Sequence, residues 1–345
     1  MGNLAKIRFW YRIIRHSIDK HCMIYYDIDN RLEHYNTLKG DEFMKHEVYM
    51  HGQVLGTHSF LLKDGFLRPD EYSEIKAKYF LPGGESGTAA TVLASLGVSV
   101  KIDGTHIGTQ VAPLLQNFYK DKAVDLSSLF FDPDYEGLMD YVVIAGLVRS
   151  PMGVFRALYE PGAKKRWNMP KEADIANCSV AGIDPFFLEE TQAAAELCVK
   201  HQKPYVTIDC THDTYLHRHC AVNVVSKECT SAAPYRDKSP EEIYDLLTAS
   251  TDGLVIITRG EKEMLYGRKG QPMKRMQPFS VEVRSTLGAG DTFKACCIYG
   301  LLRGMGDDEL VRFASACSAI AISRFPLPLY PPTAEEVEKL LSDHA

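Results

Sequence analysis

A short glycine-rich stretch that ends in an aspartate, Gly288-Ala-Gly-Asp291, combines the residue types that phosphoryl transfer requires. The small residues Gly288, Ala289 and Gly290 allow a tight turn in which several backbone N–H groups point at one spot. The positive end of a following helix would reinforce them, so the turn suits an anion such as phosphate. Asp291 then stands where a carboxylate could take a proton from an attacking hydroxyl. A helix cap after a glycine turn would explain the same aspartate without any chemistry.

The segments on either side predict how this stretch is positioned. Phe279–Val283 alternates β-branched and other residues, which favours a strand leading into the turn. Lys294–Tyr299 is rich in small residues and favours a helix leaving it. A second glycine turn, Gly83-Gly84, opens another helix with an alanine face about 200 residues earlier. Taken alone, it predicts only a turn and a helix.

Together the two glycine motifs resemble a known family. Thr286–Phe293, which reads Thr-Leu-Gly-Ala-Gly-Asp-Thr-Phe, resembles the carboxy-terminal signature of the PfkB/ribokinase-like carbohydrate kinases, and Pro82–Gly97 resembles their amino-terminal signature. The resemblance covers residues 48–340 and implies an α/β, ribokinase-like three-layer domain, with a mostly parallel sheet flanked by helices and a small β lid. It also implies phosphoryl transfer from MgATP to a hydroxyl of a small carbohydrate, with Asp291 as base and the Gly288–Gly290 amides as anion hole.

The same resemblance suggests binding residues. On the nucleotide side it implies that Lys227, Thr258 and Gly260 contact the phosphates, although Lys227 could equally be a solvated surface lysine. It also implies an adenine slot at Ala314 and Cys317, whose small side chains helix packing explains equally well. On the substrate side it implies Thr57, Gly83, Gly84, Glu85, Thr88 and Arg149. The resemblance assigns no metal ligand.

Departures from the family pattern fall on the substrate side. Thr57 stands where the family commonly has a sugar-binding Asp, and Glu85 and Thr88 stand where it usually has Asn. Ser285 replaces an Asp linked to monovalent-cation binding. These changes put the usual hydroxyl pattern and potassium dependence in doubt.

The acceptor itself stays open. Arg149 and Arg156 are possible partners for a carboxylate, which favours a sugar or a sugar acid as substrate. A nucleoside is the alternative within the same chemistry, and it would need an aromatic stack from Phe60, Phe66 or Tyr79. A member that binds a ligand without turnover is the alternative of another class.

Hydrophobic patterning along the chain predicts alternating strands and helices, the signature of a parallel sheet covered by helices. The predicted strands are Val48–Leu55, Val98–Ile102, Tyr141–Ile144, Ser179–Ile183, Tyr205–Asp209, Ala221–Val225 and Leu254–Thr258. The predicted helices are Gly87–Leu96, Thr109–Asp121, Leu188–His201, Pro240–Ser250, Thr292–Arg303, Asp308–Ser323 and Thr333–Ser342. Two inserts, 58–80 and 141–166, break this alternation, and the resemblance implies that they form the lid.

Composition limits the remaining possibilities. The 345 residues carry a net charge of −6, which argues against a nucleic-acid or membrane-surface partner. The nine cysteines are an odd number, and several lie in apolar runs, which fits reduced thiols and a cytoplasmic location. No P-loop motif and no dinucleotide fingerprint is present. We expect Met44 to be the natural start, with residues 1–43 an upstream extension of the kinase domain at 44–345. A homodimer through the lid is conceivable.

Overall fold

The computed structural model describes residues 46–66 and 70–344, which belong to one compact unit. The predicted extension at residues 1–43 lies outside the described residues. Among the residues described, no helix combines the length and the apolar character needed to cross a membrane.

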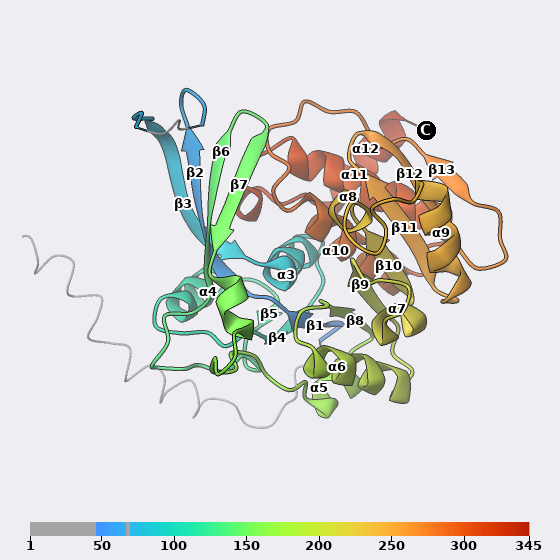
Figure 1. Ribbon diagram of the computed structural model, residues 1–345, viewed down its shortest axis with the longest axis horizontal. Coiled ribbons are helices and arrows are strands. Elements are labelled where there is room, and N and C mark those ends of the chain that lie inside the picture. The colour runs from blue at the N-terminus through green and yellow to red at the C-terminus, as the bar shows by residue number, and fades with distance from the viewer. Residues whose placement is uncertain (1–45, 67–69, 345) are drawn as a thin grey trace, which may run out of the picture. The chain divides into compact units, whose positions relative to one another are not determined.

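A nine-stranded sheet forms the centre of this unit (Figure 1). Its order is β13-β12-β11-β10-β9-β8-β1-β4-β5. Seven strands run parallel, as the alternating pattern predicts, and the last two, β12 and β13, pair antiparallel at one edge. The strands are β1 (Val48–Gly52), β4 (Val100–Gly104), β5 (Val124–Asp125), β8 (Val180–Ile183), β9 (Tyr205–Ile208), β10 (Val222–Val225), β11 (Leu254–Arg259), β12 (Lys262–Gly267) and β13 (Lys274–Met276).

Helices cover both faces of this sheet, which gives the three layers expected. One layer contains α3 (Glu85–Ser95), α4 (Val111–Tyr119), α10 (Ala289–Arg303), α11 (Asp307–Ile322) and α12 (Ala334–Asp343). The other contains α5 (Glu172–Ala176), α6 (Glu189–Lys200), α7 (Tyr215–His219) and α9 (Pro240–Ala249). Shorter helical segments are α8 (Lys227–Thr230) and the 3₁₀ turns η2 (Phe155–Tyr159) and η3 (Leu327–Leu329).

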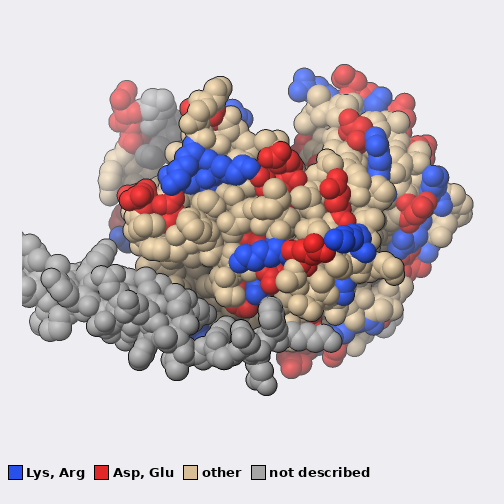
Figure 2. Space-filling view, turned by 90° about the horizontal axis from the view of Figure 1, so that it is seen from below, with Lys and Arg blue, Asp and Glu red and all other residues tan. Residues whose placement is uncertain are grey.

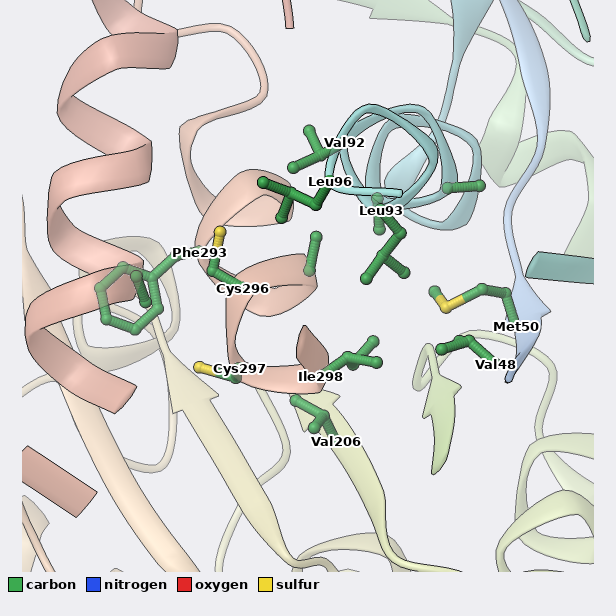
Figure 3. Close-up of a cluster of buried hydrophobic side chains, with 14 of the residues drawn as sticks. Val48, Met50, Val92, Leu93, Leu96, Val206, Phe293, Cys296, Cys297 and Ile298 are labelled. Carbon is green, nitrogen blue, oxygen red and sulfur yellow. The ribbon is translucent and has the colours of Figure 1, made fainter. Parts of the chain in front are cut away.

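Alternation along each strand divides the core between the two layers. In β1, Val48 and Met50 pack toward α3 and α10, whereas Tyr49 packs against the opposite layer. Figure 3 shows the first of these contacts, with Leu93 of α3 and Ile298 of α10 pointing into the same apolar cluster as the β1 side chains. The helix that begins at Gly288-Ala-Gly-Asp291 is therefore packed firmly between α3 and the sheet.

A second, four-stranded sheet stands beside the large one, as the resemblance implied (Figure 1). Its order is β3-β2-β6-β7, with β2 and β6 parallel and the outer pairs antiparallel. The strands are β2 (Leu55–Leu62), β3 (Ile75–Gly83), β6 (Met139–Ala145) and β7 (Val148–Gly153). We refer to these four strands as the lid sheet.

Two strand predictions were wrong. Val48–Leu55 is not one strand, because the chain breaks after Gly52 and resumes as β2 in the lid sheet. Phe279–Val283 is not a strand, because it pairs with no neighbour in either sheet. Phe279 instead stacks against Arg312 of α11, and the following backbone donates hydrogen bonds to the Ile322 carbonyl. Alternating residue types indicated an extended segment but not what it would pair with.

The charged surface agrees with the modest net charge. On the face shown in Figure 2, acidic and basic side chains are interspersed rather than gathered into a field of one sign. Ion pairs such as Lys200 with Glu172 account for part of this mixing.

Candidate active site

The strand order places a topological switch point at the carboxyl ends of β1 and β8. From β1 the chain proceeds to β4 on one side, while from β8 it proceeds to β9 on the other, and ligands bind at such switch points in open α/β sheets. Asp184 follows β8 directly, and its carboxylate lies against Gly52 at the end of β1. A methyl group built on Gly52 would lie 1.8 Å from Asp184 Oδ2. Only a glycine leaves room for this carboxylate.

The predicted phosphate turn lies at the start of α10. Gly288 adopts φ 82° as the N-cap residue, a left-handed conformation that favours glycine. An added Cβ there would meet Leu327 Cδ2 at 2.6 Å and Thr88 Cγ2 at 3.2 Å. The turn thus touches α3 through Thr88, which joins the two glycine motifs in space.

Helix geometry leaves donors free at this turn. Ala289 donates its N–H to the Thr286 carbonyl at 3.3 Å. Among the described residues, the N–H groups of Gly290 and Asp291 have no hydrogen-bond acceptor, as expected in the first turn of a helix. Two of the amides near the helix N-terminus are therefore available to an anion.

Asp291 lies in the first turn of α10, where burial raises its pKa to about 7. The nearby charge of Lys294 lowers this pKa, and that of Asp184 raises it. Weaker effects come from Arg149 of the lid sheet, which lowers the pKa, and from Asp209 after β9, which raises it. A carboxylate that changes charge near neutral pH is suited to act as a general base.

Glu85 is the first residue of α3 and faces the same group. Burial, together with the neighbouring charge of Asp291, raises its pKa to about 8. Its Oε2 is buried and, among the described residues, lacks a hydrogen-bond partner. Glu85 and Asp291 therefore form a pair of carboxyl groups that compete for protons near pH 7.

The di-glycine turn closes the substrate side. Gly84 has φ 80°, and a Cβ there would lie 2.5 Å from the Gln53 carbonyl, which accepts the N–H groups of Ser86 and Gly87. A Cβ on Gly83 would lie 1.9 Å from Thr57 Oγ1. Both glycines are thus required where the chain passes from the lid sheet into α3.

Thr57 has a carboxylate as its cross-strand neighbour. Asp140 of β6 is paired with Thr57 in the register of the lid sheet. Burial raises the pKa of Asp140, and a hydrogen bond from Thr57 lowers it. Its Oδ1 is buried without a hydrogen-bond partner among the residues described. Asp140 therefore places a carboxylate oxygen, which can accept a hydrogen bond, next to Thr57.

The predicted nucleotide residues follow β10 and β11. Ser226 caps α8 and donates its hydroxyl to Asp209 at 2.9 Å, and Lys227 beside it is exposed. In β11 the register shifts between Ile257 and Arg259, so that a bulge falls at Thr258. Gly260 follows with φ 67° and nothing within 4 Å of an added Cβ. Bulges of this kind re-aim side chains and are frequent near binding sites.

Ala314 and Cys317, predicted to line an adenine slot, belong to α11. Both are 0% exposed in the core between α10 and α11. Cys317 shares a hydrogen bond with Cys296 of α10 that raises the pKa of the Cys296 thiol, after the larger effect of burial. The helix-packing interpretation accounts for both residues without a nucleotide.

Residue patterns did not predict every member of the site. Asp184 and Asp209 each follow a buried strand, a signal that could have identified them. Lys294 stands alone in an apolar helix, which could have identified it as unusual. Asp140 carried no signal, because only the register of the lid sheet brings it to Thr57. Within the described part of the chain, no cluster of three or more His, Cys, Asp or Glu side chains could hold a metal ion.

The fold is that of the ribokinases. The chain superposes on a ribokinase from Arabidopsis thaliana, solved in complex with ribose and ATP, with a TM-score of 0.71 and 17% identity, over 86% of this chain and 99% of that one. A structure from Agrobacterium tumefaciens, provisionally named a ribokinase, gives a TM-score of 0.75 at 17% identity, over 87% of this chain and 98% of that one. These similarities establish the ribokinase-like α/β class.

Sequence comparison gives the family. The model of the pfkB family of carbohydrate kinases matches residues 157–327. A 5-dehydro-2-deoxygluconokinase from Bacillus subtilis is 24% identical over 307 residues, which are 79% of this chain and 90% of that protein. The resemblance to the pfkB family is thereby confirmed for residues 157–327, and the protein is a carbohydrate kinase.

Proposed function

We propose that the protein transfers the γ-phosphoryl group of MgATP to a hydroxyl of a small sugar acid. The observation that carries this proposal is the position of Asp291 in the first turn of α10, beside free backbone donors and at the switch point of the sheet. A base for an alcohol and donors for a phosphate are thereby brought to one place.

Asp291 accepts the proton of the attacking hydroxyl. Burial holds its pKa at about 7, so the carboxylate is both available and basic enough near neutral pH. The N–H groups of Gly290 and Asp291 stabilise the charge on the transferring phosphoryl group, and the dipole of α10 adds to this. Mg²⁺ arrives with the nucleotide, because it is held mainly by phosphates and one or two carboxylates rather than by a protein cage.

Thr258 and Gly260 are the candidates for the nucleotide phosphates, supported by the bulge and the open glycine at the end of β11. Lys227 is exposed beside them and supplies a point charge. On the acceptor side, Asp140 and Thr57 present oxygens to a substrate hydroxyl, supported by the buried oxygen of Asp140 that has no partner among the described residues.

A sugar acid is favoured over a neutral sugar by Arg149. Its charge lowers the pKa of Asp291, which brings this lid arginine within electrostatic range of the site. Among the described residues, no carboxylate forms an ion pair with it. The name of the Bacillus subtilis relative also denotes a sugar acid as acceptor. Of the three aromatic side chains that could stack on a nucleoside base, Tyr79 packs against Phe325 and Phe60 lies near His58. Phe66 is exposed and has no ring partner among the described residues, so it is the one that a nucleoside could use.

The test is ADP release from MgATP with a panel of sugar acids, matched neutral sugars and nucleosides. We expect the sugar acids to be the best acceptors and Asp291→Asn to lower kcat at least about 100-fold. Arg149→Met is expected to raise KM for the acid about tenfold or more and to leave the neutral sugar unchanged.

Arg156→Met is the matched control, because Arg156 lies in the neighbouring η2 turn and does not affect the pKa of Asp291 to a comparable degree. A full rate in Asp291→Asn would remove the base from the mechanism. Equal loss in Arg149→Met with acids and neutral sugars would remove the carboxylate contact.

A further inference from the structure

Lys294 and Asp184 form an ion pair that is completely buried. Both side chains are 0% exposed, and Lys294 Nζ donates to Asp184 Oδ1. The second oxygen, Oδ2, accepts the Ser86 hydroxyl at 2.8 Å and the Gln53 N–H at 3.1 Å. One carboxylate thus holds together α10, α3 and the connection between β1 and β2.

A contribution to folding stability does not explain why this ion pair is buried. Removing two charges from water costs several kcal/mol per ion, and apolar residues of similar volume often stabilise a core as well or better. The neighbours of Lys294 along α10 are apolar: Phe293, Ala295 and Cys296 belong to the main core. Figure 3 shows how closely Phe293 and Cys296 of α10 pack against their neighbours. We therefore infer that Lys294 has a role other than stabilising the fold.

Its position relative to Asp291 suggests that role. Lys294 lies three residues after Asp291 in α10, and residues with this spacing are neighbours on one helix face. Asp184 acts on Asp291 from the end of β8. The titratable and charged groups that face Asp291 from the packed elements are Lys294 of α10, Asp184 after β8, Arg149 of β7, Asp209 after β9 and Glu85 of α3.

We propose that Lys294 and Asp184 are positioning residues for Asp291: the pair fixes the first turn of α10 against α3, and its two opposite charges set the ionisation of the catalytic carboxylate. Lys294 favours the ionised form of Asp291, and Asp184 opposes it. Burial raises the pKa of Asp291 to about 7, and because the two charges act on it in opposite directions, each limits the effect of the other. The inference rests on the role of Asp291 proposed above.

Lys294→Met tests the proposal most directly. Asp184 keeps its hydrogen bonds from Ser86 and Gln53, while the positive charge that Lys294 provides near Asp291 is lost. We expect the acidic limb of kcat/KM against pH to move upward by about one pH unit. At pH 6.5 the variant should then lose several-fold more activity than at pH 8.5.

Asp184→Asn should move the same limb in the opposite direction. The amide oxygen can still accept a hydrogen bond, and the charge of Lys294, without its ion-pair partner, acts more strongly on Asp291. The double variant Lys294→Met/Asp184→Asn should return the limb to within about 0.3 pH units of its original position, since the two charge effects cancel. Lys294→Arg, which keeps the charge, is the matched control and should leave the limb in place.

A merely structural pair would give another result. Both single variants would then lose activity equally at all pH values, or move the limb in the same direction, and either outcome would overturn the proposal. If Lys294→Met fails to fold, Asp184→Asn is sufficient as a test. A downward shift of the acidic limb in this variant, but not in Asp184→Glu, would support the proposal, and no shift would overturn it. Asp291→Asn distinguishes failure of this proposal from failure of the proposed function. Full activity in that variant would show that Asp291 is not the base, and it would say nothing about the Lys294–Asp184 pair.

Discussion

Glu85→Gln should stabilise the protein at high pH and change little at low pH. Burial, with the neighbouring charge of Asp291, raises the pKa of Glu85 from 4.5 to about 8. The folded protein therefore binds this proton more tightly than the unfolded chain does. The resulting stability is fully present below about pH 4.5 and is lost as the pH rises through about 8. Glutamine has the same shape and no such titration.

The size of the effect follows from the pKa of Glu85. Its displacement from 4.5 to about 8, at about 1.4 kcal/mol per pH unit, corresponds to an upper limit of about 5 kcal/mol at pH 8.5. Glu85 and Asp291 share their proton binding, so part of this free energy belongs to the pair. About 1.4 kcal/mol of this is already lost at pH 5.5, so we expect the free energy of unfolding of Glu85→Gln, relative to the original protein, to rise by about 1–3 kcal/mol between pH 5.5 and 8.5.

Urea unfolding at the two pH values measures this difference. Glu241→Gln is the matched control, because Glu241 is paired with Arg275 on the surface and its pKa is lowered mainly by that hydrogen bond. Its titration lies below pH 4.5, so its effect on the free energy of unfolding should be the same at pH 5.5 and 8.5. An equally constant effect for Glu85→Gln would refute the buried, proton-binding state of Glu85.

Four other expectations follow from the geometry. Gly288→Ala places a Cβ 2.6 Å from Leu327 at φ 82°. It should lower the free energy of unfolding in urea by about 2–4 kcal/mol and should also lower kcat. The control Gly304→Ala, at φ 68° with nothing within 4 Å of the added Cβ, should lower the free energy of unfolding by only about 1 kcal/mol. Asp140→Asn should raise KM for the sugar about tenfold or more while KM for ATP is unchanged, and equal changes in both would contradict the substrate contact. Thr258→Val should raise KM for ATP selectively, and an unchanged value would remove it from the nucleotide site. Ser285 carries no charge and accepts the Leu287 N–H, so initial rates in potassium and in sodium should agree within about twofold, whereas strong activation by potassium would show a cation site elsewhere.

Local patterning predicted most of the fold and some of the site. The α10 helix was predicted from Thr292 to Arg303, and it begins three residues earlier, at Ala289, because the glycine turn itself enters the helix. Phe279–Val283 was predicted as a strand on alternation alone, yet a strand exists only where a neighbour pairs with it. The antiparallel β12 and β13 were not predicted.

Contacts between distant residues explain what the patterns missed. Lys294 and Asp184 are 110 positions apart, and Asp140 meets Thr57 only through the register of the lid sheet. Such pairs depend on how strands and helices are arranged, and no spacing rule within one element contains that information. The glycine turns were predicted correctly for the opposite reason, because their positive φ values are a local property of the chain.

The departures from the resembled family also have a physical consistency. Thr57 lacks the carboxylate that commonly binds sugar hydroxyls in the resembled family, but Asp140 has one on the adjacent strand, so we expect a substrate hydroxyl to bind at β6 instead of β2. Glu85 replaces an amide with an acid that stays protonated below about pH 8 and can therefore donate a hydrogen bond as the amide would. The resembled family pattern contains no positive charge for the substrate, whereas this chain has Arg149 in the lid sheet. A substrate with hydroxyls and one carboxylate would use all three groups, whereas a neutral sugar would leave Arg149 without a partner.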